Sequence, residues 1–314
     1  MIMRDVHWRQ YPKVFQAVTG LQVTEFDPWV EAVLPVYAEA ERKRLERPGR
    51  QRALGAGHPF ALAVRDQLLL AVVWLRLYPT HEVLGYLFGV SDSAVWRVID
   101  RVLPVLAQAG RDTMRMPDPG KKRRRTLEQL LQDTPELAVV IDSFEQRVPR
   151  PQERAEADGY SSSKKRQRTL KSQVAVDEHS GRIVADCSQS DVSASVPGPT
   201  ADITLLKQSG IMARLPAGVG AIGDLAYVGI DKLHPEGLGA CPRRKPRGQP
   251  RSAEDRAYNT AFSRRRIRVE HTLNRQRRYQ SLTQTDRHHR RLHTARVVAV
   301  AGLVNRQIDH RLSA

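Results

Sequence analysis

The chain has 314 residues, of which 40% are hydrophobic, enough for one large domain or two ordinary domains with separate cores. Lys and Arg number 51 against 34 Asp and Glu, a net charge of +17; nucleic acid is the commonest partner of so basic a protein, and scattered surface arginine without a ligand is the alternative. Two widely separated cysteines exclude a zinc finger or a disulfide framework, and no apolar run suffices for a signal peptide or a membrane span, so a cytoplasmic protein without a membrane partner is expected.

Residues 1–113 show only helical periodicity. A helix is predicted over residues 28–45, beginning at the pair Asp27-Pro28 and kinked at Pro35. A Gly- and Arg-rich connection follows, and a strongly apolar helix is predicted over residues 61–77. The first domain is therefore expected to be all-helical.

A helix-turn-helix is predicted within this domain, over about residues 61–107. Thr80 can cap a short helix, Gly89 provides the turn, and Ser91 can cap a second helix with one apolar face. On the exposed side of that second helix, Ser93 and Arg97 are candidates for contact with a DNA groove. The alternative is a helical pair that serves only for packing.

After a basic linker at residues 114–135, strand signals appear in a second domain at residues 136–314. Short apolar or alternating runs predict strands, and a helix is expected between the third and the fourth; the strands cover residues 137–144, 170–176, 183–187 and 219–227. A long basic helix at residues 253–279 and an apolar helix at residues 295–308 complete the chain. This order predicts an α/β domain with a sheet of mixed direction, flanked by helices.

Three carboxylates are candidates for a metal site. Asp142 and Asp224 end two apolar strands, and acids there would face one crevice at the carboxyl ends of neighbouring strands. Glu270 lies on the basic helix beside apolar residues, so it is either a third ligand or the partner of Arg266 in an ordinary ion pair. Hard oxygen ligands indicate Mg²⁺ or Mn²⁺, and two such ions about 4 Å apart can activate a phosphodiester.

Six ordered blocks of sequence resemble the DDE transposases of bacterial insertion sequences, in the group related to Harbinger elements. They cover about residues 137–308 and read VVIDSFEQRVPRP, YSSSKKRQRTLKSQVAVDEHSGRIV, PGPTADITLLKQSGIMARLP, AIGDLAYVGI, KPRGQPRSAEDRAYNTAFSRRRIRVEHTLNRQRRYQSL and AGLVNRQI. The resemblance implies an RNase H-like catalytic core with Asp142, Asp224 and Glu270 as its acids. It also implies that Arg266 and Arg277, at helical spacing from the glutamate, contact DNA phosphates.

The activity implied is metal-dependent cleavage and strand transfer at the ends of an insertion sequence, with two ions per site. The implied DNA partner is double-stranded DNA, both the terminal inverted repeats and the target. A dimer or larger assembly of the chain on this DNA is also expected, which would place the protein at the nucleoid. The chain departs from the family at Ser143-Phe144, where Gly-Thr is usual, at Ala201, where His is frequent, and in GDLAY, where GDSGY is usual. An inactive or domesticated protein that only binds DNA is therefore the alternative.

Other polar residues have two interpretations each. Asp202 stands at a predicted helix start, where an acid caps the helix, or supports the active site. A basic run before a strand is either a solvated face or a DNA contact; it comprises Lys164, Lys165, Arg166, Arg168 and Lys171. Glu145 and Tyr227 are expected to be structural.

Overall fold

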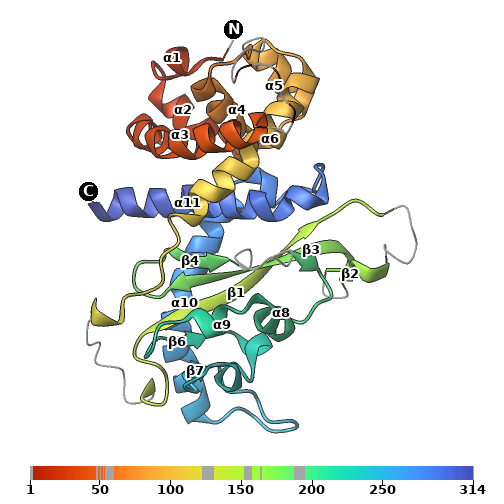
Figure 1. Ribbon diagram of the computed structural model, residues 1–314. Coiled ribbons are helices and arrows are strands. Elements are labelled where there is room, and N and C mark those ends of the chain that lie inside the picture. Colours follow the sequence, from red (N-terminus) through yellow and green to blue (C-terminus); the bar gives the residue numbers. More distant parts are fainter. Residues whose placement is uncertain are drawn as a thin grey trace. The chain divides into compact units, whose positions relative to one another are not determined.

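The computed structural model describes residues 3–46, 49, 51, 53, 60–121, 131–151, 158–162, 165–186 and 195–313. The chain divides into two compact units (Figure 1). The helical unit comprises Met1–Thr113, Arg277–Gln284 and His289–Ala314, and the sheet unit comprises Met114–Gln276 and Thr285–His288. The segment after the sheet is thus shared between the units, whereas the sequence suggested one domain over residues 136–314.

The helical unit is built from helices whose ends follow local capping signals. Its helices are α1 (Asp5–Trp8), α2 (Pro12–Thr19), α3 (Val23–Leu45), α4 (Val64–Leu77), α5 (His81–Phe88), α6 (Asp92–Arg111) and α11 (His293–Ser313), with 3₁₀ turns η6 (Gln280–Leu282) and η7 (Arg290–Leu292). Helix α3 begins earlier than predicted because Gln22 and Glu25 form a reciprocal capping box. Pro28 and Pro35 then lie inside the helix, seven residues apart on its exposed side, where water can satisfy the carbonyls they leave free.

Helices α5 and α6 form the predicted helix-turn-helix. The Thr80 hydroxyl accepts a hydrogen bond from the Val83 amide, and the Ser91 hydroxyl accepts one from Ala94, so both predicted caps are present. Gly89 ends α5 in the left-handed conformation (φ 64°). The buried face of α6 continues to Gly110, past residue 107, where the predicted helix-turn-helix ended.

Helix α11 completes the core of the helical unit by packing on α6. Two glycines face each other at the crossing: a side chain on Gly302 would overlap the Cα of Gly110, and one on Gly110 would come within 2.6 Å of the Val298 carbonyl oxygen. Small residues let the two helix backbones approach closely, and most of α11 is buried. The apolar periodicity at the C-terminus therefore serves the helical unit.

The sheet unit confirms the predicted mixed sheet. Its strands are β1 (Ala138–Arg147), β2 (Ser161–Ser162), β3 (Gln167–Asp177), β4 (Ile183–Asp186), β5 (Val196–Pro197), β6 (Gly220–Ile222) and β7 (Gly239–Ala240). The order is β2-β3-β1-β6-β7, with β4 and β5 also pairing with β3. Strand β1 is antiparallel to β3 and parallel to β6, which is parallel to β7.

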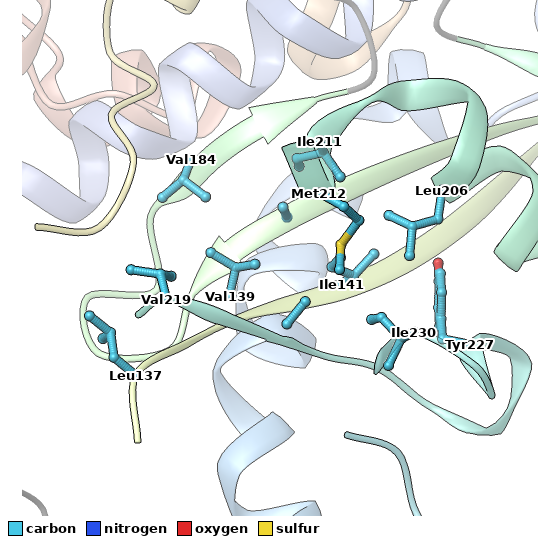
Figure 2. Close-up of a cluster of buried hydrophobic side chains, with 12 residues drawn as sticks. Leu137, Val139, Ile141, Val184, Leu206, Ile211, Met212, Val219, Tyr227 and Ile230 are labelled. Carbon is cyan, nitrogen blue, oxygen red and sulfur yellow. The ribbon is translucent and has the colours of Figure 1, made fainter. Parts of the chain in front are cut away.

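Helices cover both faces of this sheet (Figure 1). On one face lie α8 (Asp202–Ser209) and α9 (Ile211–Arg214), which split the single helix predicted there at Gly210. Figure 2 shows Leu206, Ile211 and Met212 packed onto Val139 and Ile141 of β1. Alternate residues of β1 therefore face this core, and the residues between them face the other side.

The other face is covered by the long helix α10 (Ala253–Arg277). It buries an apolar stripe against the sheet, formed by Tyr258, Ala261, Phe262, Val269 and Leu273. A buried ion pair joins Arg265 to Glu178 at 2.7 Å, and Arg265 also donates to Thr134 and to the Pro135 carbonyl. Because all its donors are engaged in fixed directions, Arg265 sets the rotation of α10 on the sheet. The short 3₁₀ turns of this unit are η1 (Pro119–Lys121), η4 (Leu225–Tyr227) and η5 (Asp231–Leu233).

Candidate active site

Asp142 lies on β1, and Asp224 lies just after the end of β6, the parallel neighbour of β1. The register pairs Val140 with Ile222, and each acid comes two residues later in its strand direction. Neighbouring strands are about 4.8 Å apart, so this register brings the two acids into the same part of the sheet. β6 ends at Ile222, and Asp224 instead caps η4 by accepting a hydrogen bond from Ala226 at 2.9 Å.

The sequence predicted that Asp142 ends its strand, but in the structure it lies in the middle of β1. Strand β1 continues to Arg147 because β3 pairs with it over its whole length, including Val174 opposite Asp142. Only the partner on the other side, β6, stops. At the level of Asp142, β1 is therefore paired with β3 on one side only.

The carboxylate of Asp142 is in an unfavourable electrostatic setting. Burial raises its pKa above the ordinary value, and the charges of Asp224 and Asp202 raise it further. The backbone N–H of Ser143 and the guanidinium of Arg266 act in the opposite direction without cancelling the rise. Asp224 and Asp202 are thus close enough to Asp142 to disfavour its ionised form, and a carboxylate with a raised pKa is typical of functional sites.

Arg266 reaches Asp142 from α10. Its Nη2 lies 3.6 Å from the Asp142 carboxylate, and its buried Nε has no hydrogen-bond partner in the described part of the chain. The ion pair proposed from helical spacing, between Arg266 and Glu270, is therefore not formed. A buried donor without an acceptor is costly, and an anion bound beside Asp142 would satisfy it.

Glu270 lies one turn after Arg266, on the same stripe of α10. Its side chain is exposed, as is that of Ile267 (47%), whereas the apolar neighbours Val269 and Leu273 are buried. Four residues of helix span about 6 Å along the axis, so the Cα of Glu270 lies about 6 Å further along α10 than that of Arg266, which contacts Asp142. Within the described residues, no three acidic, His or Cys side chains are gathered closely enough to form a complete metal site.

Asp202 is held by a buried polar network, and it does not cap its helix. The N-cap of α8 is Ala201, without a side-chain bond. The Ser143 hydroxyl donates to Asp202 at 2.6 Å, and the Lys171 ammonium lies 3.1 Å from the same oxygen. Asp202 therefore takes part in the site through Ser143, the neighbour of Asp142.

Lys171, which the sequence suggested as a DNA contact, is buried in the structure. Its side chain is 8% exposed and its ammonium also donates to the Thr200 carbonyl at 2.6 Å. Glu145, directly opposite Lys171 in the β1–β3 register, lies 3.9 Å away and accepts from Thr169 at 2.7 Å. The alternation of side chains along β3 could have predicted that Lys171 is buried, since it places Lys171 on the same face as Gln173 and Ala175.

Gln173 extends the network to the turn that carries Asp224. Its side-chain amide donates to the Tyr227 hydroxyl at 2.9 Å and to the Asp202 carbonyl at 3.3 Å. Burial raises the pKa of Tyr227 well above its ordinary value, so this phenol stays neutral. Tyr227 is packed in the core, as expected, and ties η4 to the sheet.

The candidates for DNA contact are distributed over both units. In the helical unit, Ser93 and Arg97 are exposed on α6 beside Trp96, which is also exposed, and Arg277 is exposed at the end of α10. In the sheet unit, Lys165 is exposed and Arg168 is half-buried. Lys164 lies outside the described residues. Among the helices that the structure describes, none combines the length and apolarity needed to cross a membrane.

Comparison with known proteins identifies related sequences for both units. The family model for the DDE superfamily endonuclease matches residues 141–305, more than half of the chain, and the model for the helix-turn-helix of DDE superfamily endonuclease matches residues 60–112. No solved structure gives a significant match.

Two curated proteins are also similar to the chain. A probable transposase for insertion sequence element IS702 from Microchaete diplosiphon is 27% identical over 294 residues, which is 94% of this chain and 94% of that protein. A putative transposase for insertion sequence element IS112 from Streptomyces albus G is 32% identical over 96 residues, 31% of this chain and 32% of that protein. With a family match over more than half of its length, Asp142 on the central strand of a mixed sheet and a helix-turn-helix in its helical unit, the chain belongs to the DDE superfamily endonucleases.

Proposed function

We propose that this endonuclease is a DNA transposase that cleaves the ends of an insertion sequence and joins them to target DNA. The observation that carries the proposal is the position of Asp142 on β1 beside Asp224, which follows the end of the parallel strand β6, with the charge of Asp224 helping to raise the pKa of Asp142. The near full-length similarity to a probable transposase supports the same substrate and reaction. The DNA-binding protein without nuclease activity is the less favoured alternative, since neither acid is lost.

The acids suit a divalent metal site of the Mg²⁺ or Mn²⁺ type. Carboxylate oxygens are the ligands that these ions prefer, and a cation between Asp142 and Asp224 would remove the repulsion that raises the pKa of Asp142. Two bound ions would polarise the scissile phosphate and activate the attacking hydroxyl. We assign Glu270 as the third ligand because it shares a helix stripe with Arg266, which already contacts Asp142.

The chain's own residues would place the DNA. Arg266 is suited to hold the phosphate beside Asp142, because its buried Nε lacks an acceptor. Ser143 and Lys171 keep Asp202 in position behind Asp142. Exposed basic residues would hold the flanking double helix through its phosphates; they are Arg277, Lys165, Arg168 and, in the helix-turn-helix, Arg97 with Ser93. Joining two ends requires a dimer or larger assembly on DNA in the nucleoid.

The test uses DNA that carries the terminal inverted repeats of the element. Asp142→Asn, Asp224→Asn and Glu270→Gln are each expected to abolish Mg²⁺-dependent cleavage while DNA binding persists, because each removes a ligand charge without changing the basic surface. Glu254→Gln is the matched control, since Glu254 is exposed on the same helix and pairs only with Arg243 in the described residues. Normal cleavage by the Glu270 variant would remove that residue from the site. A wild-type protein that binds these ends but never nicks them would establish the non-enzymatic alternative.

A further inference from the structure

A hollow lined by arginine lies at the far end of the β1–β3 pair. Its volume is about 350 Å³, and it is lined by Arg147, Val148, Pro149, Arg150, Arg166, Gln167, Arg168 and Thr285. The lining carries four guanidinium groups and no carboxylate. Within the described residues, no acid pairs with Arg147, Arg150 or Arg166. The hollow is therefore a concentration of positive charge within the sheet unit.

The walls of this arginine hollow are held by the backbone. Val148 donates to the Arg168 carbonyl at 2.9 Å, which extends the β1–β3 pairing past Arg147. The Arg147 carbonyl in turn accepts from the Asp286 amide at 2.8 Å and fixes the segment that contributes Thr285. The arginine side chains thus project from a frame that hydrogen bonds hold in place.

Arg166 occupies a conformation that favours glycine. Its φ is +51°, in the left-handed region, where a side chain costs about 1 kcal/mol. Residues in such conformations concentrate at sites of binding and catalysis, where the side chain is needed despite the strain. Arg166 faces the hollow, so its guanidinium has a use there that glycine could not supply.

The chemistry of the hollow fits phosphodiester groups. Like charges in one concavity repel one another, and an anion offsets that repulsion. The forked guanidinium matches two oxygens of a phosphate, and several forks around one hollow suit consecutive phosphates.

The position of the hollow relates it to the acids. Arg147 is five residues beyond Asp142 along β1, which is about 17 Å at ~3.4 Å per residue. Phosphates of one strand of B-DNA are spaced by about 3.4 Å along the helix axis. We propose that the arginine hollow is a second DNA-binding subsite, which holds the backbone about five nucleotides from the phosphate that is cut. This inference rests on the proposed function, because the distance is counted from the phosphate that is cut at the acids. The hollow is then a second subsite for the same DNA substrate.

The test measures binding of the full-length protein to duplex end DNA over a range of salt concentrations. Arg147→Gln/Arg150→Gln is expected to reduce the slope of log affinity against log salt by about 2, one for each lost phosphate contact. Lys207→Gln/Lys232→Gln is the control, since it removes two exposed charges of the same unit outside the hollow. This reduction in slope is expected on DNA that extends about ten base pairs on both sides of the cut. It is expected to vanish when the DNA on one side is trimmed to about three base pairs.

Arg166→Gly gives a second, independent readout. Glycine relieves the left-handed strain, so thermal stability is expected to stay equal or rise while DNA affinity falls. Equal slopes for the hollow variant and the control pair, or equal losses on long and trimmed DNA, would overturn the subsite. Absence of metal-dependent cleavage with the length-dependent binding intact would instead count against the proposed function, so the two failures are distinguishable.

Discussion

At the scale of the residue, the decisive feature is a carboxylate that the fold places at an energetic disadvantage. The Asp142 side chain is only 21% exposed and lies near the negative charges of Asp224 and Asp202, and Arg266 is the cation that pairs with it. A protein tolerates such repulsion where a ligand relieves it, which is a common feature of active sites. Its consequences are measurable without any DNA.

Asp142→Asn is expected to stabilise the metal-free protein at neutral pH. Because the folded-state pKa of Asp142 is raised, the folded protein favours the protonated acid, and ionisation costs folding free energy as pH rises through the folded value. The variant's advantage in melting temperature should therefore be large at neutral pH and disappear as pH falls to about 4, the ordinary pKa of Asp. Mn²⁺ should raise the melting temperature of the wild type and not of the variant. An advantage that grows toward low pH would contradict this reasoning.

Lys171 gives a second prediction at this scale. Lys171→Met removes the buried cation beside the partly buried Asp202 and is expected to reduce the free energy of unfolding by about 3 kcal/mol in urea titrations. Lys171→Met/Asp202→Asn should recover part of that loss, because it also removes the uncompensated charge. A double variant that is no more stable than Lys171→Met would show that the lysine acts through packing alone.

At the scale of the element, one long helix in each unit depends on contacts with residues distant in the sequence. In the sheet unit, the buried pair of Arg265 and Glu178 orients α10, and the next residue, Arg266, lies 3.6 Å from the Asp142 carboxylate. In the helical unit, α11 contacts α6 at two facing glycines. These contacts join segments that are distant in sequence, so each helix depends on its partner for its place.

Gly302→Val is therefore expected to destabilise the helical unit by about 2 to 3 kcal/mol, because the new side chain meets the backbone of Gly110, which cannot move aside cheaply. Thermal unfolding followed by circular dichroism would measure the loss. Gly159→Val is the control, since a Cβ at Gly159 meets no atom within 4 Å. Equal stability of the two variants would mean that the helices can separate at no cost.

At the scale of the whole molecule, the chain forms its helical unit from both of its ends. The segment Met1–Thr113 is completed by Arg277–Gln284 and His289–Ala314, while the sheet unit is formed from the chain between them. The helix-turn-helix lies in the helical unit and Asp142 and Asp224 lie in the sheet unit, and the chain passes between the two units four times. This arrangement makes a direct prediction about fragments.

A fragment of residues 1–113 is expected to lack cooperative thermal unfolding, because without α11 it exposes the apolar face of α6. Joining residues 1–113 to residues 277–314 through a flexible linker should restore a cooperative transition. Thermal unfolding of the two fragments, followed by circular dichroism, would compare them. A cooperative transition in the short fragment would show that α11 is dispensable to the unit.

Local signals in the sequence sufficed wherever one residue acts on its own neighbours. Thr80 and Ser91 cap the helices that they precede, and the apolar run before Asp142 forms the central strand, because capping and alternation depend on the adjacent backbone alone. The family resemblance and the choice of candidate acids also came from sequence. The assignment of Glu270 as a ligand remains a prediction.

The tertiary structure decided which distant residues become partners. Arg266 pairs with Asp142 and not with Glu270, Lys171 is enclosed by Asp202 and Glu145, and α11 joins the helical unit. These partners are set by the strand register, by the rotation of the helices and by which distant segments pack together. Each of these features depends on many weak contacts along the whole chain. A charged side chain takes the partner that the packed backbone brings within reach, and sequence spacing alone does not contain that distance.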